Sequence, residues 1–409
     1  MRGDCAKISC HINASLPIVN VLKNNKNVIS YLYNNVTYLV SNNNSFEPPK
    51  IVDRQFRKPL LCGPGPSDVW PSVAEALTRP ILSPICDETF NVLDDIRRGL
   101  QYVFQTKSPL VLAVSGSGHM GMEAIISNLV APGETLLIAT RGIWDERASI
   151  VATRHGIKVE KIHVPMNATF NLEQIEPALR RLRPTALFIT HGDSSTGTMQ
   201  NLQGLGDLCH KYGTLVLVDT VVSLVGVPFF MDAWKVDAVY TSTQKAFSGP
   251  AGISAIAFSA KADSQFYRSN NIAFLFYHHT MSPPLLWALR RCLEEVCQET
   301  LPKAWARHAA TVEVFQRKLT QFGFELLVPK PEDRLATVTT VVLPKGYDYL
   351  EFTTYLRENH NILIFRGLGP TVGKALRIGL MGVNATTEIA EHVANAMIST
   401  LKSLKKSAL

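Results

Sequence analysis

Residues 109–121 read PLVLAVSGSGHMG, and this stretch decides the fold. Residues 109–114 are a short apolar run with the length and composition of a buried strand. Residues 115–119 (SGSGH) are small and follow that run directly, as expected of a sharp turn. Apolar residues then recur at helical spacing, at Met122, Ile125, Ile126 and Leu129. A strand that turns through small residues into a helix predicts the first unit of an open α/β sheet.

The same alternation continues along the chain. Further strand-like runs occupy residues 135–139, 186–190, 214–219, 237–241 and 252–258. Helical patterns lie between them at residues 172–182 and 202–212. This spacing predicts right-handed crossovers and a mainly parallel sheet with helices on both faces. Ligands of such sheets bind beyond the carboxyl ends of the strands, so the residues at those ends are the candidates for a functional site.

The chain has 409 residues, which is more than one small core needs, and a second domain is expected. Long helical patterns at 285–296 and 305–322 lead to strand-like runs at 338–343, 362–365 and 375–380, with helices predicted at 349–359 and 387–402. Residues 1–46 contain ten asparagines and one acidic residue, which is typical of a disordered or targeting extension. We therefore predict four parts: the extension 1–46, a large domain 47–284, a small α+β domain 285–402 and a tail 403–409.

The composition is that of an ordinary globular protein, with 46% apolar and 18% charged residues. No apolar run approaches the roughly 20 residues that cross a bilayer, so no membrane partner is expected. The net charge is +7, but the basic residues are scattered and the sequence contains no nucleic-acid-binding motif. No nucleic-acid partner is therefore expected. The seven cysteines form neither a CxxC pair nor a His/Cys cluster, which argues against a metal site and favours a reducing compartment inside the cell.

The turn at residues 115–119 is a candidate anion site. Small residues let the backbone approach an anion, and a helix start offers N–H groups with partial positive charge. Residues 116–121 (GSGHMG) also match a dinucleotide fingerprint, but the next strand ends in Arg141 where that fingerprint needs an acid. NAD therefore fits poorly and NADP stays open, as does a tight turn that binds nothing.

Two charged residues follow other strand ends. Asp219 ends a buried strand, where a carboxylate needs a cationic partner such as a protonated pyridine nitrogen. A helix N-cap or an internal salt bridge is the alternative. Lys245 follows the run 237–241 in a turn of small residues, where partial burial would lower its pKa and favour attack on an aldehyde. A solvated surface lysine is the alternative there. The anion cradle, the acid and the lysine all fall at strand ends of one predicted sheet.

Two further side chains are candidates. Trp144 follows the strand at 135–139 and can lie against a flat ring, although a core tryptophan is the alternative. Arg377 lies within the apolar run 375–380, where a guanidinium needs an anion. A substrate carboxylate held by two hydrogen bonds would satisfy it, and an internal ion pair is the alternative.

From about residue 48 to residue 402, these motifs resemble the animal alanine–glyoxylate (serine–pyruvate) aminotransferases, which include the insect 3-hydroxykynurenine transaminases. The matching segments stand in family order at residues 63–67 (GPGPS), 101–105, 115–119, 142–144, 191–197 (HGDSSTG), 218–219, 244–245, 277–280, 367–370 and 376–379. The resemblance implies an α/β fold of type I with a mainly parallel seven-stranded sheet, a bound pyridoxal 5'-phosphate and a homodimer.

The resemblance also implies a role for each matching residue. Lys245 would form the Schiff base and exchange the substrate α-proton, and Asp219 would pair with the pyridine nitrogen. The phosphate would be held by Ser117, Gly118, His119 and Gln244, together with Tyr277 and Thr280 of the neighbouring subunit. Trp144 would stack on the ring, Ser194 would contact cofactor or substrate, and Arg377 would bind the substrate carboxylate. An amino acid and a keto acid, with alanine or serine donating to glyoxylate or pyruvate, are the expected substrates.

The chain departs from the family pattern in two places that bear on activity. The segment before Tyr277 is shorter than in the family, around residues 270–276, which leaves a non-catalytic relative as an alternative. Ser83 is followed by Pro84 where kynurenine-type members carry Ser-Asn, and Pro84 offers neither a side-chain donor nor an N–H. The resemblance implies that Ser83 contacts substrate. Because Pro84 lacks these donors, we expect a small amino donor to be preferred over 3-hydroxykynurenine. An NADP-dependent oxidoreductase remains the rival of another class.

The last three residues, 407–409 (SAL), resemble a peroxisomal address without its usual basic middle residue. The peroxisome is therefore the expected compartment, with mitochondrion and cytoplasm as alternatives.

Overall fold

The computed structural model describes residues 49–266 and 281–404. The chain divides into two units, Met1–Arg57 and Lys58–Leu409. In the first unit, the described residues 49–57 form neither helix nor strand. All elements discussed below belong to the second unit.

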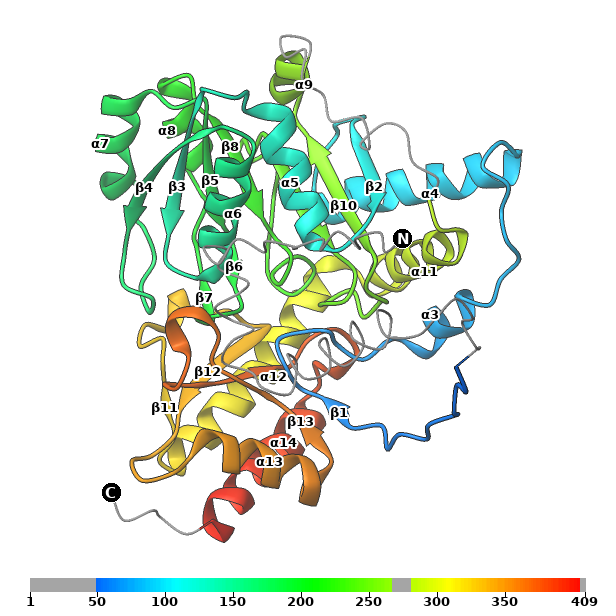
Figure 1. The fold of residues 1–409 in the computed structure, drawn as a ribbon, viewed down its shortest axis with the longest axis vertical. Coiled ribbons are helices and arrows are strands. Elements are labelled where there is room, and N and C mark those ends of the chain that lie inside the picture. The colour runs from blue at the N-terminus through cyan, green and yellow to red at the C-terminus, as the bar shows by residue number, and fades with distance from the viewer. Residues whose placement is uncertain (1–48, 267–280, 405–409) are drawn as a thin grey trace, which may run out of the picture. The chain divides into compact units, whose positions relative to one another are not determined.

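A seven-stranded sheet forms the centre of the larger part of this unit (Figure 1). Its strands, in spatial order, are β2 (Val111–Ser115), β10 (Ile253–Phe258), β9 (Ala238–Ser242), β8 (Leu215–Asp219), β5 (Ala186–Thr190), β3 (Thr135–Thr140) and β4 (Lys158–His163). Only β10 runs against its two neighbours, β2 and β9. The predicted mainly parallel seven-stranded sheet is therefore confirmed, and the carboxyl ends of the other strands meet at one edge.

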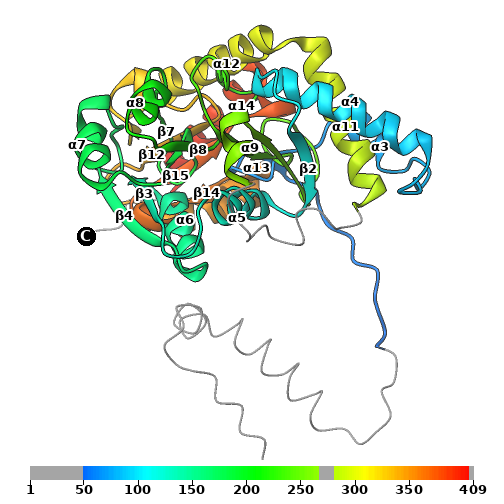
Figure 2. The same ribbon diagram turned by 90° about the horizontal axis from the view of Figure 1, so that it is seen from above.

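Helices cover both faces of this sheet (Figure 2). One face carries α5 (Gly118–Leu129) and α6 (Ile143–Arg154), and the other carries α4 (Asp87–Phe104), α7 (Leu172–Leu182), α8 (Leu205–Lys211) and α11 (Pro283–Glu299). Successive residues of β3 alternate between the two cores: Leu136 and Ile138 pack on the α5 side, Leu137 and Ala139 on the other. Because both faces are buried, the strands appear in the sequence as uninterrupted apolar runs.

The edge strand β4 was not predicted from the sequence. Its residues, KVEKIH, pair only with β3, and several of them remain exposed. An edge strand that is partly exposed to water can contain polar residues throughout. Its sequence therefore lacks the uninterrupted apolar run by which the other strands of the sheet were predicted.

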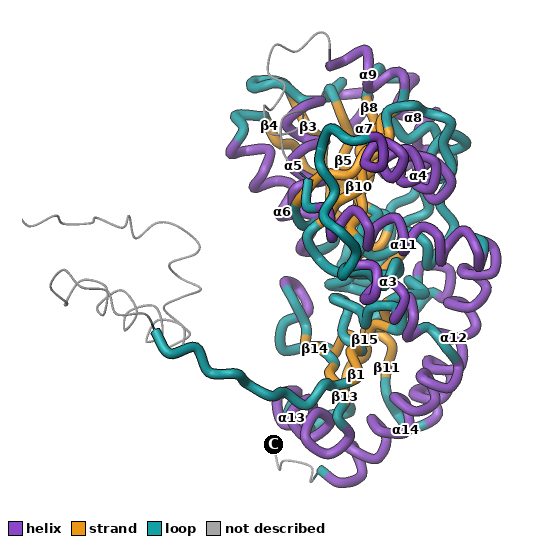
Figure 3. Tube along the Cα trace, turned by 90° about the vertical axis from the view of Figure 1, so that its right-hand side faces the viewer, coloured by secondary structure: helices purple, strands orange, loops and turns teal. Residues whose placement is uncertain are grey.

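The carboxyl-terminal part holds a four-stranded antiparallel sheet, ordered β11 (Glu325–Leu326), β12 (Val338–Val342), β15 (Leu376–Gly379) and β14 (Phe365–Arg366). Around it lie α12 (Leu301–Gln321), α13 (Tyr349–His360) and α14 (Thr387–Ser403) (Figure 3). The run 362–365, predicted as one strand, is split. Its first half, β13 (Ile362–Leu363), pairs instead with β1 (Leu60–Leu61).

The remaining elements are short: α3 (Pro71–Ala76), β6 (Gly192–Asp193), β7 (Thr198–Met199), α9 (Ala260–Phe266) and 3₁₀ turns at Pro331–Asp333, Gly369–Thr371 and Gly382–Asn384. Helix α11 packs against α3 and α4, whereas α12 packs against α14. The domain boundaries expected from the sequence remain predictions. Within the described residues, every helix is too short or too polar to span a membrane.

Candidate active site

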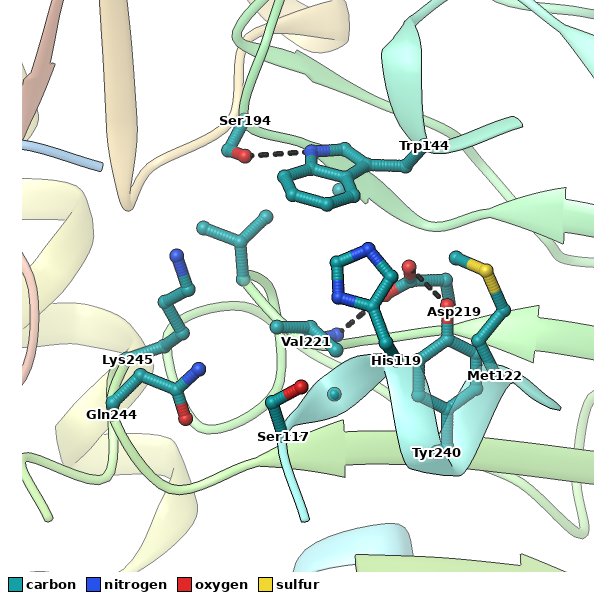
Figure 4. A pocket seen from close by; sticks show the side chains of 13 residues that line it. Ser117, His119, Met122, Trp144, Ser194, Asp219, Val221, Tyr240, Gln244 and Lys245 are labelled. Carbon is teal, nitrogen blue, oxygen red and sulfur yellow. Dashed lines mark hydrogen bonds between the residues drawn. The ribbon is translucent and has the colours of Figure 1, made fainter. Parts of the chain in front are cut away.

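A pocket opens where the carboxyl ends of β2, β8 and β9 meet (Figure 4). Its volume is about 140 Å³, and it is lined by Ser117, Gly118, His119, Met122, Trp144, Gly192, Ser194, Asp219, Val221, Val222, Tyr240, Gln244 and Lys245. Eight of the residues singled out in the sequence therefore lie around one cavity.

The floor of the pocket is the turn from β2 into α5. Gly116 has a φ of +140°, which L side chains rarely adopt, and α5 begins two residues later at Gly118. Among the residues that the structure describes, no side chain caps this helix start, and its first turn contains no acidic residue. A Cβ at Gly118 would lie 3.0 Å from Val221 Cγ2, so glycine keeps the backbone close to the neighbouring strands. The turn retains the properties of an anion cradle.

Asp219 lies at the carboxyl end of β8 and is almost fully buried. Its Oδ1 accepts a hydrogen bond from the Val221 N–H at 2.7 Å, and its Oδ2 accepts one from the Tyr240 hydroxyl. Burial raises the pKa of this carboxyl to about 7. Among the described residues no cation forms an ion pair with it, so a salt bridge within this part of the chain does not explain the charge.

Lys245 lies in the turn that follows β9, with its side chain directed into the pocket (Figure 4). Its Nζ donates a hydrogen bond to the Pro64 carbonyl at 2.6 Å. Burial lowers the pKa of the amine to about 8; the charge of Arg377 adds to this effect, and that of Asp219 opposes it. The alternative of a solvated surface lysine is therefore wrong, and the amine is more available as a nucleophile near neutral pH.

The loop at residues 63–67 holds the lysine from the opposite side. The Ser67 hydroxyl donates to the Lys245 carbonyl at 2.7 Å, and the Ser67 N–H donates to the Gln244 carbonyl at 2.9 Å. Gly65 has a φ of +117°, and a Cβ there would lie 2.2 Å from Lys245 Nζ. In the sequence this GPGPS motif contributed only to the family resemblance, and its contact with the lysine was not foreseen.

Trp144, at the start of α6, and Ser194, after β6, form the upper wall. The indole Nε1 donates to the Ser194 hydroxyl at 2.8 Å, and the Trp144 ring meets His119 edge-on with 5.7 Å between centroids. Trp144 is thus held at the pocket rather than in a core, with one face available for a flat ring.

Arg377 lies on β15 and is almost fully buried; it does not line the pocket itself but contacts Ser194, which does. Its Nε donates to the Arg366 carbonyl and its Nη1 to the Ser194 carbonyl, each at 3.0 Å. No carboxylate of the described residues pairs with it, which removes the internal ion pair as its explanation within that part of the chain. Burial lowers the pKa of the guanidinium to about 10, and the negative charge of Asp193 opposes this shift. An incoming carboxylate would neutralise the charge of the guanidinium.

Ser83 does not join this pocket. It lies exposed in the turn before α4, where its carbonyl accepts a hydrogen bond from the Thr89 hydroxyl at 2.5 Å. Its contact with substrate stays a prediction. Tyr277, Thr280 and the shortened stretch 270–276 lie outside the described residues.

Arg141, the cation on which an NADP site would depend, is buried and fully engaged. Its guanidinium donates to the Thr198 hydroxyl and the Gln200 side chain, each at 2.9 Å, and to the Thr190 carbonyl. It does not line the pocket and has no free face for a ribose phosphate. The alternative in which Arg141 serves NADP is therefore wrong, because the side chain is hydrogen-bonded to residues at the neighbouring strand ends.

Comparisons with known proteins identify the family of this chain. Residues 82–392 match the family model Aminotransferase class-V, and the chain belongs to that family. The alanine–glyoxylate aminotransferase of Rattus norvegicus is 39% identical over 383 residues, covering 88% of this chain and 92% of that protein. Its namesake in Drosophila melanogaster is 36% identical over 380 residues, covering 88% and 96%.

Solved structures give the same result. The crystal structure of an alanine–glyoxylate aminotransferase from Nostoc sp. superposes with a TM-score of 0.84 at 37% identity, covering 86% of this chain and 98% of that one. The chain is thus an aminotransferase, as the resemblance implied, and the oxidoreductase alternative is excluded.

Proposed function

We propose that this aminotransferase uses pyridoxal phosphate to move an amino group from alanine or serine to glyoxylate or pyruvate. One observation carries the proposal: a buried carboxylate and a buried amine face the same cavity beside a helix start, and within the described part of the chain the carboxylate has no ion-pair partner and the helix start no side-chain cap. The relatives that share most of this chain are alanine–glyoxylate aminotransferases, which supports glyoxylate as the acceptor.

The residues present fit pyridoxal phosphate. Ser117, Gly118 and His119 at the start of α5, with Gln244, would hold the phosphate. Trp144 and Val221 would lie on opposite faces of the ring, and Asp219 would pair with its protonated nitrogen. When bound, the cofactor supplies an aldehyde and an electron-accepting ring.

Two residues of the chain would bind the substrate and move its α-proton. Arg377 would grip the substrate carboxylate and so orient the amino acid toward Lys245. The Lys245 amine, with its pKa near 8, can both accept and return a proton at neutral pH, and it would carry the α-proton.

Alanine and glyoxylate mixed with the purified protein and pyridoxal phosphate are expected to give pyruvate and glycine in equal amounts. Serine and 3-hydroxykynurenine, offered in place of alanine, test the order of donor preference. A yellow protein that transaminates none of these donors would instead support the non-catalytic relative. A colourless protein that takes up no pyridoxal phosphate would contradict the proposal as a whole.

We also propose a homodimer, in which Tyr277 and Thr280 of the neighbouring subunit complete the phosphate site. Large apolar side chains lie exposed around the start of α4: Ile81 at 73%, Ile85 at 84% and Phe90 at 56%. Such a group of apolar residues supports a surface covered by a second protein. Sedimentation at micromolar concentration is expected to give about twice the chain mass of 45.2 kDa, and a monomer would contradict the dimer.

For the compartment we propose the peroxisome, on the resemblance of residues 407–409 to a peroxisomal address. A fluorescent protein that carries the last twelve residues is expected to gather in peroxisomes. The same fusion with Ala408→Lys, which restores the usual basic residue, is the positive control. Diffuse fluorescence from the unchanged tail alone would exclude this address.

A further inference from the structure

Tyr240 lies beside Asp219 in the sheet, in a position that the resemblance gave no role. The two residues are direct partners on neighbouring strands, Asp219 on β8 and Tyr240 on β9. The Tyr240 hydroxyl donates to Asp219 Oδ2, and both side chains line the pocket (Figure 4). Tyr240 is completely buried.

The phenol ring is closely packed on one side. Gly121 of α5 lies against it, and a Cβ at that glycine would stand 2.9 Å from both Cβ and Cδ2 of Tyr240. On the other side, Asp219 is held by the Val221 N–H at Oδ1. The two oxygens of the carboxylate therefore each receive one donor from the protein, and its plane is set before any ligand arrives.

We infer that Tyr240 is a positioning residue, which orients the Asp219 carboxylate and stabilises its charge for pairing with a cationic ring nitrogen. The part that concerns the ring rests on the proposed function. The part that concerns the carboxylate does not, since both groups belong to this chain.

The hydrogen bond from Tyr240 affects the pKa of Asp219, which can be measured. The groups that act on Asp219 come from several neighbouring segments: Tyr240, Asp145, Asp193, Lys245 and Arg141. Burial raises the pKa of Asp219 to about 7, and the hydrogen bond from Tyr240 opposes that rise. Without this donor the pKa would rise further.

The raised pKa of Asp219 makes the stability of the folded protein depend on pH. The pKa of Asp219 in the folded protein, about 7, lies above the ordinary value of 3.8. The stability linked to this group is therefore fully present below about pH 4 and is lost as the pH rises to about 7. In Tyr240→Phe the loss should extend to a pH higher by about one unit.

Melting temperatures of the cofactor-free protein between pH 5 and 9 test the inference. Tyr240→Phe is expected to displace the Asp219-linked decline upward, and the displacement should vanish in the Asp219→Asn background. The matched control is Tyr212→Phe, which also loses a hydroxyl bonded to a carboxylate, Glu176 Oε1 at 2.5 Å, but away from the pocket. A Tyr240→Phe profile that runs parallel to the Tyr212→Phe profile would overturn the inference.

A second measurement involves pyridoxal phosphate itself. Tyr240→Phe is expected to weaken its binding about tenfold at pH 7.5, whereas Tyr212→Phe leaves it unchanged. Unchanged affinity in Tyr240→Phe would overturn the pairing role. If the wild-type chain binds no pyridoxal phosphate, the proposed function fails, while the melting profiles still decide the role of Tyr240 toward Asp219.

Discussion

Lys245→Ala is expected to abolish covalent attachment of pyridoxal phosphate and to lower transamination by about 10³-fold or more. The substitution removes both the amine that would bond the aldehyde and the group that would move the substrate proton. Treatment with borohydride followed by peptide mass analysis should locate the cofactor on Lys245 in the wild-type chain and nowhere in the variant.

Lys211→Ala provides the matched control, because Lys211 is an exposed lysine whose Nζ lies 3.0 Å from Glu176 Oε1, outside the pocket. It should keep both the covalent attachment and the full rate. Residual turnover of Lys245→Ala at the wild-type rate, or trapping of the cofactor on another lysine, would refute the role assigned to this amine.

Gly65→Ala is expected to reduce turnover about a hundredfold while the protein stays folded. The added Cβ would meet the Lys245 side chain at Nζ, Cε and Cδ, all within 2.6 Å. A lysine end is flexible, so it can move aside at little cost to the fold. It would then leave the Pro64 carbonyl and the position from which it reaches the cofactor.

Gly133→Ala separates this steric effect from backbone strain. Gly133 also has a positive φ, +86°, yet a Cβ there would meet nothing within 4 Å. Both variants should lose roughly 1–2 kcal/mol of stability, the usual cost of placing an L residue in such a conformation. Only Gly65→Ala should lose turnover. Equal rates in the two variants would show that the loop does not position the lysine.

The fold could be predicted for the strands that are buried on both faces, because burial restricts their sequence to apolar residues. The runs at 135–139, 186–190 and 214–219 became β3, β5 and β8 almost residue for residue, because strands buried on both faces must be apolar throughout. The edge strand β4 escaped this reasoning, and the run 362–365 was predicted as one strand where the chain forms two, β13 and β14. Their pairing is decided by neighbours distant in the chain, which local composition does not reveal.

The residues of the candidate site could likewise be predicted only in part. Asp219 and Lys245 stood out because charged residues are unusual next to buried strands, and the structure places both at one cavity. Tyr240 and Gly65 carried no such signal. The tyrosine looked like one more core residue of a strand, and only the register of β8 against β9 brings its hydroxyl to Asp219. The glycine belonged to a loop whose partner lies about 180 residues further along the chain.

Ser194 accepts two hydrogen bonds from the site. Its hydroxyl accepts one from the Trp144 indole, and its carbonyl accepts one from the Arg377 guanidinium. Under the proposed function, a substitution that moves Arg377 would therefore also disturb the residue that holds the Trp144 ring over the coenzyme. Variants at Arg377 that are made to change donor preference should accordingly be screened for retention of the coenzyme as well.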